Sequence, residues 1–246
     1  MTHERITGGM AFVGRVERRG ERVVRKTARP DRAPESHRCI EREARALDVL
    51  GERLALRLLA HTMHESQPAL VINDLGAENL GQRIESGRAI DMAALGDALL
   101  MELALVHDAG FAHRDLKCSN VMCSVRVALI DFGHAEPLGT RVHHEGAFWT
   151  QPPEGSGSLV TTAADLYAAG LVLFRATARA HPFGWSPELS ADQWREHAAL
   201  GPPPLRAFVA DLEHLDDFFA RALSPQPNDR FTDAHDMRRS WLEVTR

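Results

Sequence analysis

The middle of the chain holds a dense group of polar side chains between two stretches of apolar periodicity. Residues 113–120 read His113-Arg114-Asp115-Leu116-Lys117-Cys118-Ser119-Asn120, and Asp131-Phe132-Gly133 follows after a short apolar run. Asp115 and Asn120 share one predicted loop, and Asp131 stands at the end of the next predicted strand. Carboxylate and amide oxygens suit Mg²⁺, and a second carboxylate can accept a proton from a hydroxyl. The segment therefore predicts a phosphoryl-transfer site, because that reaction depends on holding phosphates, metal and acceptor in line.

The residues before this segment predict a small sheet and one main helix. Residues 10–28 contain two apolar runs around Gly20, a pattern typical of a hairpin. Beyond a proline-containing loop, apolar residues recur at helical spacing, at Ile40, Ala44, Leu47 and Leu50. Glu43 lies on a neighbouring face of that predicted helix. Two short apolar runs predict further strands, at residues 54–59 and 69–73.

The residues around and after the polar segment predict a mostly helical back. A long apolar-periodic helix is predicted at residues 91–109 and ends at Gly110. Short strands are predicted on either side of a turn, at residues 121–123 and 127–130. Further helices are predicted at residues 163–178, 189–199, 205–223 and 233–244. The breakers Gly201-Pro202-Pro203-Pro204 and Pro225-Gln226-Pro227 separate the last three. The expected architecture is a β-rich front and an α-rich back.

Composition narrows the function classes. The 246 residues are 44% apolar and 26% charged, enough to bury the core of one globular unit or two small lobes. No apolar run is long enough to span a membrane, and the first residues lack the layout of a signal peptide, so we expect an intracellular, cytoplasmic protein. The net charge of -5 gives no reason to expect nucleic-acid binding. The three cysteines and the scattered histidines have no spacing that suggests a zinc site.

The two lysines are the most informative residues of the composition. Of 29 basic side chains only Lys26 and Lys117 are lysine, and the rest are arginine. Arginine bias with abundant alanine indicates GC-rich coding, so a position that keeps lysine invites a chemical reason. A compact ammonium fits against phosphate oxygens where a larger, planar guanidinium does not. Retention of lysine therefore favours phosphate chemistry at these two positions.

The order and spacing of these motifs resemble the eukaryotic-type protein kinase family, with its His-Arg-Asp catalytic loop and Asp-Phe-Gly metal motif. The resemblance implies an α+β fold of two lobes in a single domain over residues 1–246. A small β-rich N-lobe with one main helix would occupy about residues 1–75, and a larger helical C-lobe residues 76–246. It also implies ATP and Mg²⁺ as cofactors and protein substrates as partners. The two lysines fall on both lysine positions of the family, one of the 406 possible pairs among 29 basic residues.

The resemblance also assigns roles to individual residues. Asp115 would be the catalytic base and Lys117 would neutralise the γ-phosphate. Asn120 and Asp131 would hold Mg²⁺. Lys26, paired to Glu43, would position the α- and β-phosphates.

The nucleotide-binding residues follow from the same resemblance. Residues 9–16 match the phosphate-covering pattern G-x-G-x-x-G-x-V, except that Ala11 replaces the middle glycine. Val24 stands where the family usually has alanine, so we expect a tighter adenine pocket. Ile72 would be the gatekeeper, followed by a hinge that contains Asp74. The implied nucleotide contacts are Gly9, Ala11, Gly14, Val16, Val24, Lys26, Ile72, Asp74 and Met122.

The match continues through the C-terminal half. Gln151-Pro152-Pro153-Glu154 stands for the family's Ala-Pro-Glu motif, and residues 165–170 begin its central C-lobe helix. Arg230 belongs to the late arginine motif and is expected to form a buried ion pair with Glu154. The wording of these segments also resembles herpesvirus-encoded kinases. A viral source would place the protein in the host cytoplasm or nucleus, whereas an actinobacterial source fits the GC-rich coding equally.

Acceptor, regulation and activity leave alternatives open. Lys117 resembles the serine/threonine kinases, but Ala147 replaces a threonine that they commonly carry. Between Asp131 and Glu154 the hydroxyl residues are Thr140 and Thr150, of which Thr140 is the expected switch, while Glu136 or Glu145 could serve as a built-in acidic substitute. An ATP-silent pseudokinase scaffold and a small-molecule phosphotransferase of the same ancestry are the alternative functions. Substrate and oligomeric state stay open.

Overall fold

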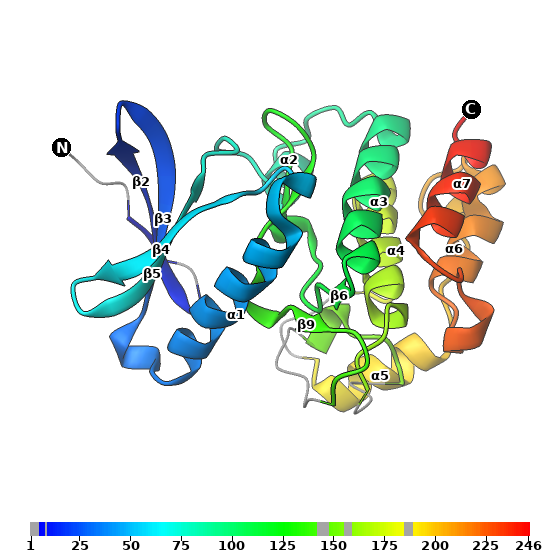
Figure 1. The fold of residues 1–246 in the computed structure, drawn as a ribbon. Helices are drawn as coiled ribbons and strands as arrows, with labels where there is room; N and C mark the ends of the chain where they lie inside the picture. Colours follow the sequence, from blue (N-terminus) through cyan, green and yellow to red (C-terminus); the bar gives the residue numbers. More distant parts are fainter. Residues whose placement is uncertain (1–4, 8, 142–147, 155–158, 185–188) are drawn as a thin grey trace.

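The computed structural model describes residues 5–7, 9–141, 148–154, 159–184 and 189–246. A β-rich lobe and a larger helical lobe are joined by an extended link near residue 75 (Figure 1). The strands of the described residues are β1 (Arg5–Thr7), β2 (Ala11–Arg18), β3 (Glu21–Ala28), β4 (Leu58–His64), β5 (Gln67–Asn73), β6 (Phe111–Ala112), β7 (Val121–Met122), β8 (Ala128–Leu129) and β9 (Glu136–Pro137). The α-helices are α1 (Glu35–Leu50), α2 (Leu80–Glu85), α3 (Met92–Asp108), α4 (Ala163–Ala178), α5 (Ala191–Ala199), α6 (Asp216–Ala222) and α7 (Ala234–Val244). The predicted division into a β-rich front and an α-rich back is confirmed.

The front lobe is a five-stranded antiparallel sheet in the order β1-β2-β3-β5-β4. The predicted hairpin is formed by β2 and β3, which turn at Arg19 and Gly20, both with positive φ. α1 lies between this sheet and the helical lobe (Figure 1). Its predicted apolar stripe is buried, since Ile40, Leu47 and Leu50 are each no more than 1% exposed. This helix therefore touches both halves of the molecule.

The predicted strand at residues 54–59 is misplaced. Leu54, Ala55 and Leu56 are almost fully buried, yet they lie outside the sheet, and β4 begins only at Leu58. The Asn73 side chain accepts from the Arg57 backbone N–H and donates to the Ala55 carbonyl, which fixes this run as a loop. The continuous apolar run indicates that these residues are buried, but it does not indicate a strand. The edge strand β4 itself alternates between partly buried and exposed residues.

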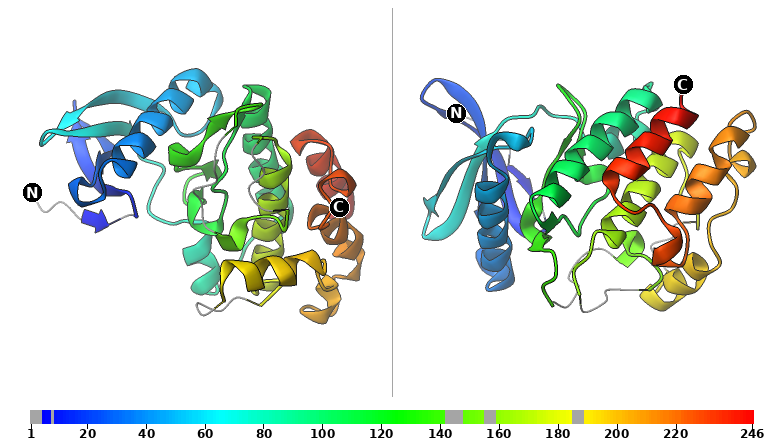
Figure 2. Two further views of the ribbon diagram at one scale, coloured as in Figure 1. Left: turned by 90° about the horizontal axis from the view of Figure 1, so that it is seen from below. Right: turned by 45° about the vertical axis from the view of Figure 1, so that its right-hand side comes forward.

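The helical lobe is built around α3 and α4, with α7 packed beside α3 (Figure 2). α3 begins where the Asp91 side chain caps the Ala94 N–H, and its C-terminal end is followed by Gly110 at φ 82°. α4 has the predicted bounds of residues 163–178. The predicted helices at 189–199 and 233–244 are observed within two residues as α5 and α7.

The predicted helix at residues 205–223 is wrong. This stretch contains two short 3₁₀ turns, Leu205–Ala207 and Glu213–Leu215, and only then the two-turn helix α6. Leu205 and Leu215 are buried, but most residues between them are exposed. No continuous apolar stripe is therefore present in this stretch to stabilise a long helix by packing. The Asp216 carboxylate instead accepts from the Arg206 backbone N–H across the intervening loop.

Two further features bear on the site. β6 pairs with β9, a ladder that was not predicted. β7 pairs with β8, and these two strands were predicted one and two residues too long. The β6–β9 ladder holds the start of the segment around residues 113–120 against the segment that follows Asp131. In the part of the chain that the structure describes, no helix is both long and apolar enough to cross a membrane.

Candidate active site

A buried cluster of three charges joins the sheet, α1 and the segment after β8. The Lys26 Nζ lies 2.5 Å from Glu43 Oε2 and 2.9 Å from Asp131 Oδ1. Lys26 is carried by β3, and Glu43, only 1% exposed, is carried by α1. The Asp131 side chain is 43% exposed, so one end of the cluster is open to a ligand. Glu43 and Asp131 thus meet at the ammonium group of Lys26, although Asp131 lies 105 residues from Lys26 in the sequence.

The charges of this cluster shift one another's pKa values. Burial disfavours the charged form of Lys26, but the Asp131 and Glu43 carboxylates outweigh it and raise its pKa well above the usual range. The nearby ammonium of Lys26 lowers the pKa of Asp131 far below its ordinary value, against the effect of burial. Burial raises the pKa of Glu43, and the charge of Asp131 adds to that rise. Lys26 and Asp131 are therefore charged at neutral pH.

The predicted catalytic loop forms a second group of bonded polar side chains. Lys117 Nζ lies 2.7 Å from Asp115 Oδ2, and the Asn120 amide donates to the same oxygen at 3.0 Å and to the Asp115 carbonyl at 2.8 Å. Asp115 Oδ1 is buried and has no hydrogen-bond partner among the residues that the structure describes. A buried carboxylate oxygen without a donor is costly, so this atom is suited to accept a proton or a hydrogen bond from a ligand.

Asp165 fixes the backbone of this loop. It is 1% exposed and accepts from the backbone N–H groups of His113 at 2.7 Å and Arg114 at 2.8 Å. His107 Nε2 lies 3.0 Å from the same carboxylate. Burial would raise the pKa of Asp165, but the hydrogen bond with His107 and the nearby charges lower it overall. These bonds support Arg114, whose φ of 65° is unusual for a non-glycine residue.

The roles of Asp165 and His107 as supports were missed from the sequence. The sequence predicts Asp165 only as the first residue of a helical motif, although a single aspartate within the apolar run of residues 163–170 is a signal that could have identified it. His107 sits at helical spacing within α3 and carries no local signal. Cys118, in the same loop, is 4% exposed, and burial raises the pKa of its thiol to about 11, so it behaves as a small packing residue.

The two bonded groups are adjacent. The backbone N–H of Ile130 donates to the Asn120 carbonyl at 3.0 Å, which places Asp131 next to the catalytic loop. Asp131 itself has a φ of 68°, a left-handed conformation that re-aims its carboxylate after the β8 strand. The donor set fits Mg²⁺, because the Asn120 amide directs its N–H group at Asp115 and leaves its oxygen free to ligate, while Asp131 is partly exposed.

The strand register shows which faces of β2 carry the predicted nucleotide contacts. Val13 pairs with Lys26 and Arg15 pairs with Val24, so these side chains share the face that carries the lysine. Val16 pairs with Val23 and lies on the opposite face, as does Gly14. Val16 and Gly14 line a hollow together with Phe12, Arg25 and Thr27, and Val13 also borders it. Val13 and Ala11 thus share the lysine face, and Gly9 lies in the turn before β2, while the nucleotide contacts expected of Gly9, Ala11, Gly14 and Val16 stay predictions.

The predicted gatekeeper and hinge lie where the sheet joins the link. Ile72 pairs with Val24 in the sheet and is 6% exposed, and Met122 on β7 is 8% exposed. The Asp74 carboxylate is engaged by two arginines. It is held by Arg15 at 3.1 Å and Arg22 at 2.8 Å, so any nucleotide contact of Asp74 has to come from its backbone.

The predicted ion pair of the C-terminal half is present. Arg230 donates to the two carboxylate oxygens of Glu154 at 2.7 and 2.6 Å, and its side chain is fully buried. The same guanidinium donates to the carbonyls of Ser224, Ala163 and Pro225 and lies over the Tyr167 ring at 4.7 Å. Ala147 and Glu145, on which the acceptor and regulatory alternatives partly depend, lie outside the described residues.

Comparison with known proteins decides the family. The sequence profile described as the protein kinase domain matches residues 7–242, nearly the whole chain. The chain belongs to the protein kinase domain family. The predicted α+β fold of two lobes is accordingly confirmed as the kinase fold.

Individual relatives of this kinase domain come from distant organisms. It is 27% identical to the serine/threonine-protein kinase PKZ1 of Phytophthora infestans over 85% of this chain and 61% of that protein. It is 27% identical to the serine/threonine-protein kinase Pkn1 of Myxococcus xanthus over 91% of this chain and 34% of that protein. It is 32% identical to PknB of Mycolicibacterium smegmatis over 64% of this chain and 26% of that protein. The chain thus spans between about a quarter and three fifths of the length of these relatives.

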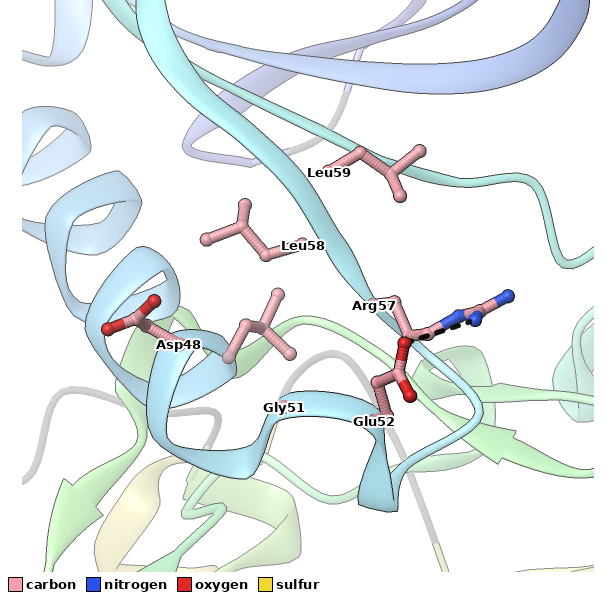
Figure 3. A pocket seen from close by; sticks show the side chains of 7 residues that line it. Asp48, Gly51, Glu52, Arg57, Leu58 and Leu59 are labelled. Carbon is pink, nitrogen blue, oxygen red and sulfur yellow. Dashed lines mark ion pairs between the residues drawn. The ribbon is translucent and has the colours of Figure 1, made fainter.

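A surface pocket of about 200 Å³ lies away from the charged cluster of the kinase domain (Figure 3). It is formed by the end of α1, the following 3₁₀ turn and the start of β4, with Leu58 and Leu59 on one side and Asp48 on the other. Arg57 and Glu52 face each other at its rim, 4.0 Å apart. None of the predicted site residues lines this pocket, so it has no part in the chemistry considered below.

Proposed function

We propose that this kinase domain transfers the γ-phosphate of ATP to serine or threonine hydroxyls of protein substrates. The observation that carries the proposal is the convergence of Lys26, Glu43 and Asp131, next to the bonded set of Asp115, Lys117 and Asn120. These groups can supply what phosphoryl transfer requires of a protein: positive charge for the phosphates, oxygen ligands for Mg²⁺ and a carboxylate that orients the acceptor hydroxyl.

In this proposal each group has a task that its surroundings allow. Lys26, kept charged by two carboxylates, neutralises and orients the α- and β-phosphates. Asp115 accepts the proton of the attacking hydroxyl at its unpartnered Oδ1, while Lys117 and Asn120 hold the other oxygen in place. Lys117 also lies close enough to the base to neutralise the charge of the transferred phosphoryl group.

Asn120 and Asp131 would hold Mg²⁺. When bound, the ion screens the phosphate oxygens and draws them into line with the acceptor. Asp131 is available for this because its carboxylate stays ionised beside Lys26. The adenine ring would lie between the lysine face of the sheet, at Val13, Val24 and Ile72, and Met122 of the C-lobe.

The position of Lys117 and the names of the relatives support a preference for serine and threonine hydroxyls. Lys117 stands two residues after the base, as the family's serine/threonine members have it, and PKZ1 and Pkn1 carry that name. Phosphoamino-acid analysis of a labelled protein substrate tests this point. Label confined to phosphotyrosine would overturn the preference without touching the transferase itself.

The central experiment measures transfer of radiolabelled phosphate from ATP to a generic basic protein, with MgCl₂ present. Asp115→Asn and Lys26→Met are each expected to lower the rate on the order of 10³-fold. Asp217→Asn, on an exposed aspartate of α6, is the matched control and is expected to leave the rate unchanged.

Nucleotide binding is measured in the same samples by equilibrium dialysis. Rates in both site variants equal to wild type would contradict the proposal. Binding of ATP without any transfer by the wild type would favour a pseudokinase scaffold, and transfer to small molecules alone would favour the small-molecule phosphotransferase.

A further inference from the structure

A second ion pair ties α1 to the helical lobe. Arg42, the residue before Glu43, places its guanidinium 2.9 Å from Glu136. The two side chains are only 19% and 12% exposed. Glu136 lies in β9, where it pairs with Ala112 of β6, directly before the catalytic loop. The pair therefore links α1, the helix that carries Glu43, to β9. β9 in turn pairs with β6, the strand that leads into the loop of Asp115.

The two neighbours on α1 pin the helix at two points. Successive residues of an α-helix point about 100° apart, so Glu43 faces Lys26 on the sheet while Arg42 faces β9. A helix that touches both lobes can slide or rotate as they move, and either motion would separate Glu43 from Lys26. With Arg42 on Glu136, such a motion has to break a largely buried ion pair.

The segment after Glu136 is held by hydrogen bonds in which Thr140 carries no phosphate. The Thr140 hydroxyl donates to the Pro137 carbonyl at 2.7 Å. Gly139 N–H donates to the Val160 carbonyl, and Val160 N–H donates to the Thr140 carbonyl, each at 2.9 Å. Both the side chain and the backbone of Thr140 are thus engaged while the hydroxyl is unmodified. Among the described residues, the segment near Thr140 reaches this arrangement through these backbone bonds and the bond of the unmodified Thr140 hydroxyl.

We propose that Glu136 is a positioning residue, a permanent anion that docks Arg42 and keeps α1 in the arrangement that joins Glu43 to Lys26. The active arrangement then does not depend on phosphorylation of Thr140. A single carboxylate is sufficient because it faces one guanidinium, and a charge-assisted bond of this kind is strong when shielded from water. The inference rests on the proposed function and names how its site is held ready.

The test uses enzyme treated with a phosphatase, so that no residue carries a phosphate. The treated wild type is expected to keep its full transfer rate. Glu136→Gln and Arg42→Gln are each expected to lower kcat about tenfold, the size of a typical coupling between two conformations. The KM for ATP should change less than about twofold, because the adenine contacts are the same in both positions of α1 and only the alignment of the phosphates for transfer is lost.

Rescue and control variants separate positioning from mere folding. Glu136→Asp, which keeps the anion, and the charge exchange Arg42→Glu with Glu136→Arg are expected to recover about a third of the rate or more. Thr140→Ala is expected to match wild type. Arg38→Gln, which breaks an exposed pair with Glu35 on the same helix, is the control and should also match wild type.

Hydrogen exchange of the α1 amides gives a readout that needs no transfer. Faster exchange around Glu43 in Glu136→Gln, but not in Arg38→Gln, supports the inference even if the wild type transfers no phosphate, an outcome that would sink only the proposed function. Unchanged kcat and unchanged exchange in Glu136→Gln would overturn the inference. So would a treated wild type and a Thr140→Ala variant that both lose activity.

Discussion

Lys26 and Arg230 are two buried cations that the fold treats in opposite ways. Around Arg230 every direction of the guanidinium has an acceptor, and Glu154 takes it with both oxygens. Around Lys26 one partner is left open to a ligand, since the Asp131 side chain is 43% exposed. A fully satisfied cation stabilises a fold, whereas a cation with open neighbours is prepared for a ligand. The difference separates the structural end of the molecule from its reactive end.

Replacing Lys26 by arginine is the strongest way to break this comparison. A guanidinium keeps the positive charge but cannot occupy the space of a compact ammonium between Glu43 and Asp131. We expect phosphate transfer to fall by about 10² to 10³-fold, while the free energy of unfolding changes by less than about 1 kcal/mol. Steady-state kinetics and urea denaturation measure the two quantities. A variant that unfolds easily but transfers phosphate normally would reverse the assignment.

The reciprocal change, Arg230→Lys, should act on stability and not on chemistry. An ammonium cannot reach both Glu154 oxygens and three carbonyls at once. The expected loss is about 2 to 3 kcal/mol of unfolding free energy, and at 2 to 4 °C per kcal/mol that lowers Tm by roughly 4 to 12 °C. Activity per folded molecule should be kept below the new Tm. A thermal shift of less than about 1 °C would show that the clamp contributes little.

A third buried base, His181, sharpens the comparison because it is kept neutral. Burial, together with the charge of Arg175, lowers its pKa to about 4 from the ordinary 6.5. The unfolded chain therefore binds a proton between these values that the folded chain excludes, so stability is complete above about pH 6.5 and is lost as the pH falls toward 4. We expect a loss of about 3 kcal/mol across this window.

His181→Gln should flatten this part of the acid denaturation profile, measured by urea titration at several pH values. His214→Gln, on an exposed histidine of the same lobe, is the matched control. Parallel profiles for wild type and His181→Gln would show that the imidazole takes no part in the acid response. The packing of His181 against Trp194, with ring centroids 4.8 Å apart, is the contact that a charged ring would have to disrupt.

The smallest effect concerns the two faces of β2 at the reactive end. Val13→Ala should raise the KM for ATP by roughly fivefold, about 1 kcal/mol, because it removes apolar surface from the face that carries Lys26. Val16→Ala, on the opposite face, should leave that KM unchanged. The pair of variants is its own control, since the two changes remove the same atoms. A larger effect at Val16 would restore the contact predicted from the sequence pattern.

How far the sequence reaches depends on what each residue needs to be placed. The bounds of α4 follow from a strong local pattern, and the pairing of Arg230 with Glu154 follows from the order of motifs. The register of β2 does not, because a shift by one residue turns every side chain to the other face and only the partner strand decides it. The face of β2 on which Val16 lies could not be predicted for that reason, and its nucleotide contact stays a prediction.

Short and non-local features were the hardest to predict. β6 and β9 have two residues each, too few to show a period, and they exist because Ala112 and Glu136 meet in space. α2 is only six residues long, although its capping box of Asn79 and Gln82 was a readable signal. The Arg42 and Glu136 pair joins residues with no local pattern in common.

The link between the lobes is fastened on both sides. Arg15 donates to the Gly76 carbonyl at 2.6 Å and, with Arg22, holds Asp74. On its other side Gly76 leaves no room for a side chain, since a Cβ there would come within 2.5 Å of the Ser124 Cβ. The connection between the two lobes is therefore rigid near Gly76. Any widening of the space between the lobes has to bend the chain beyond Gly76 or first release the arginine from its carbonyl.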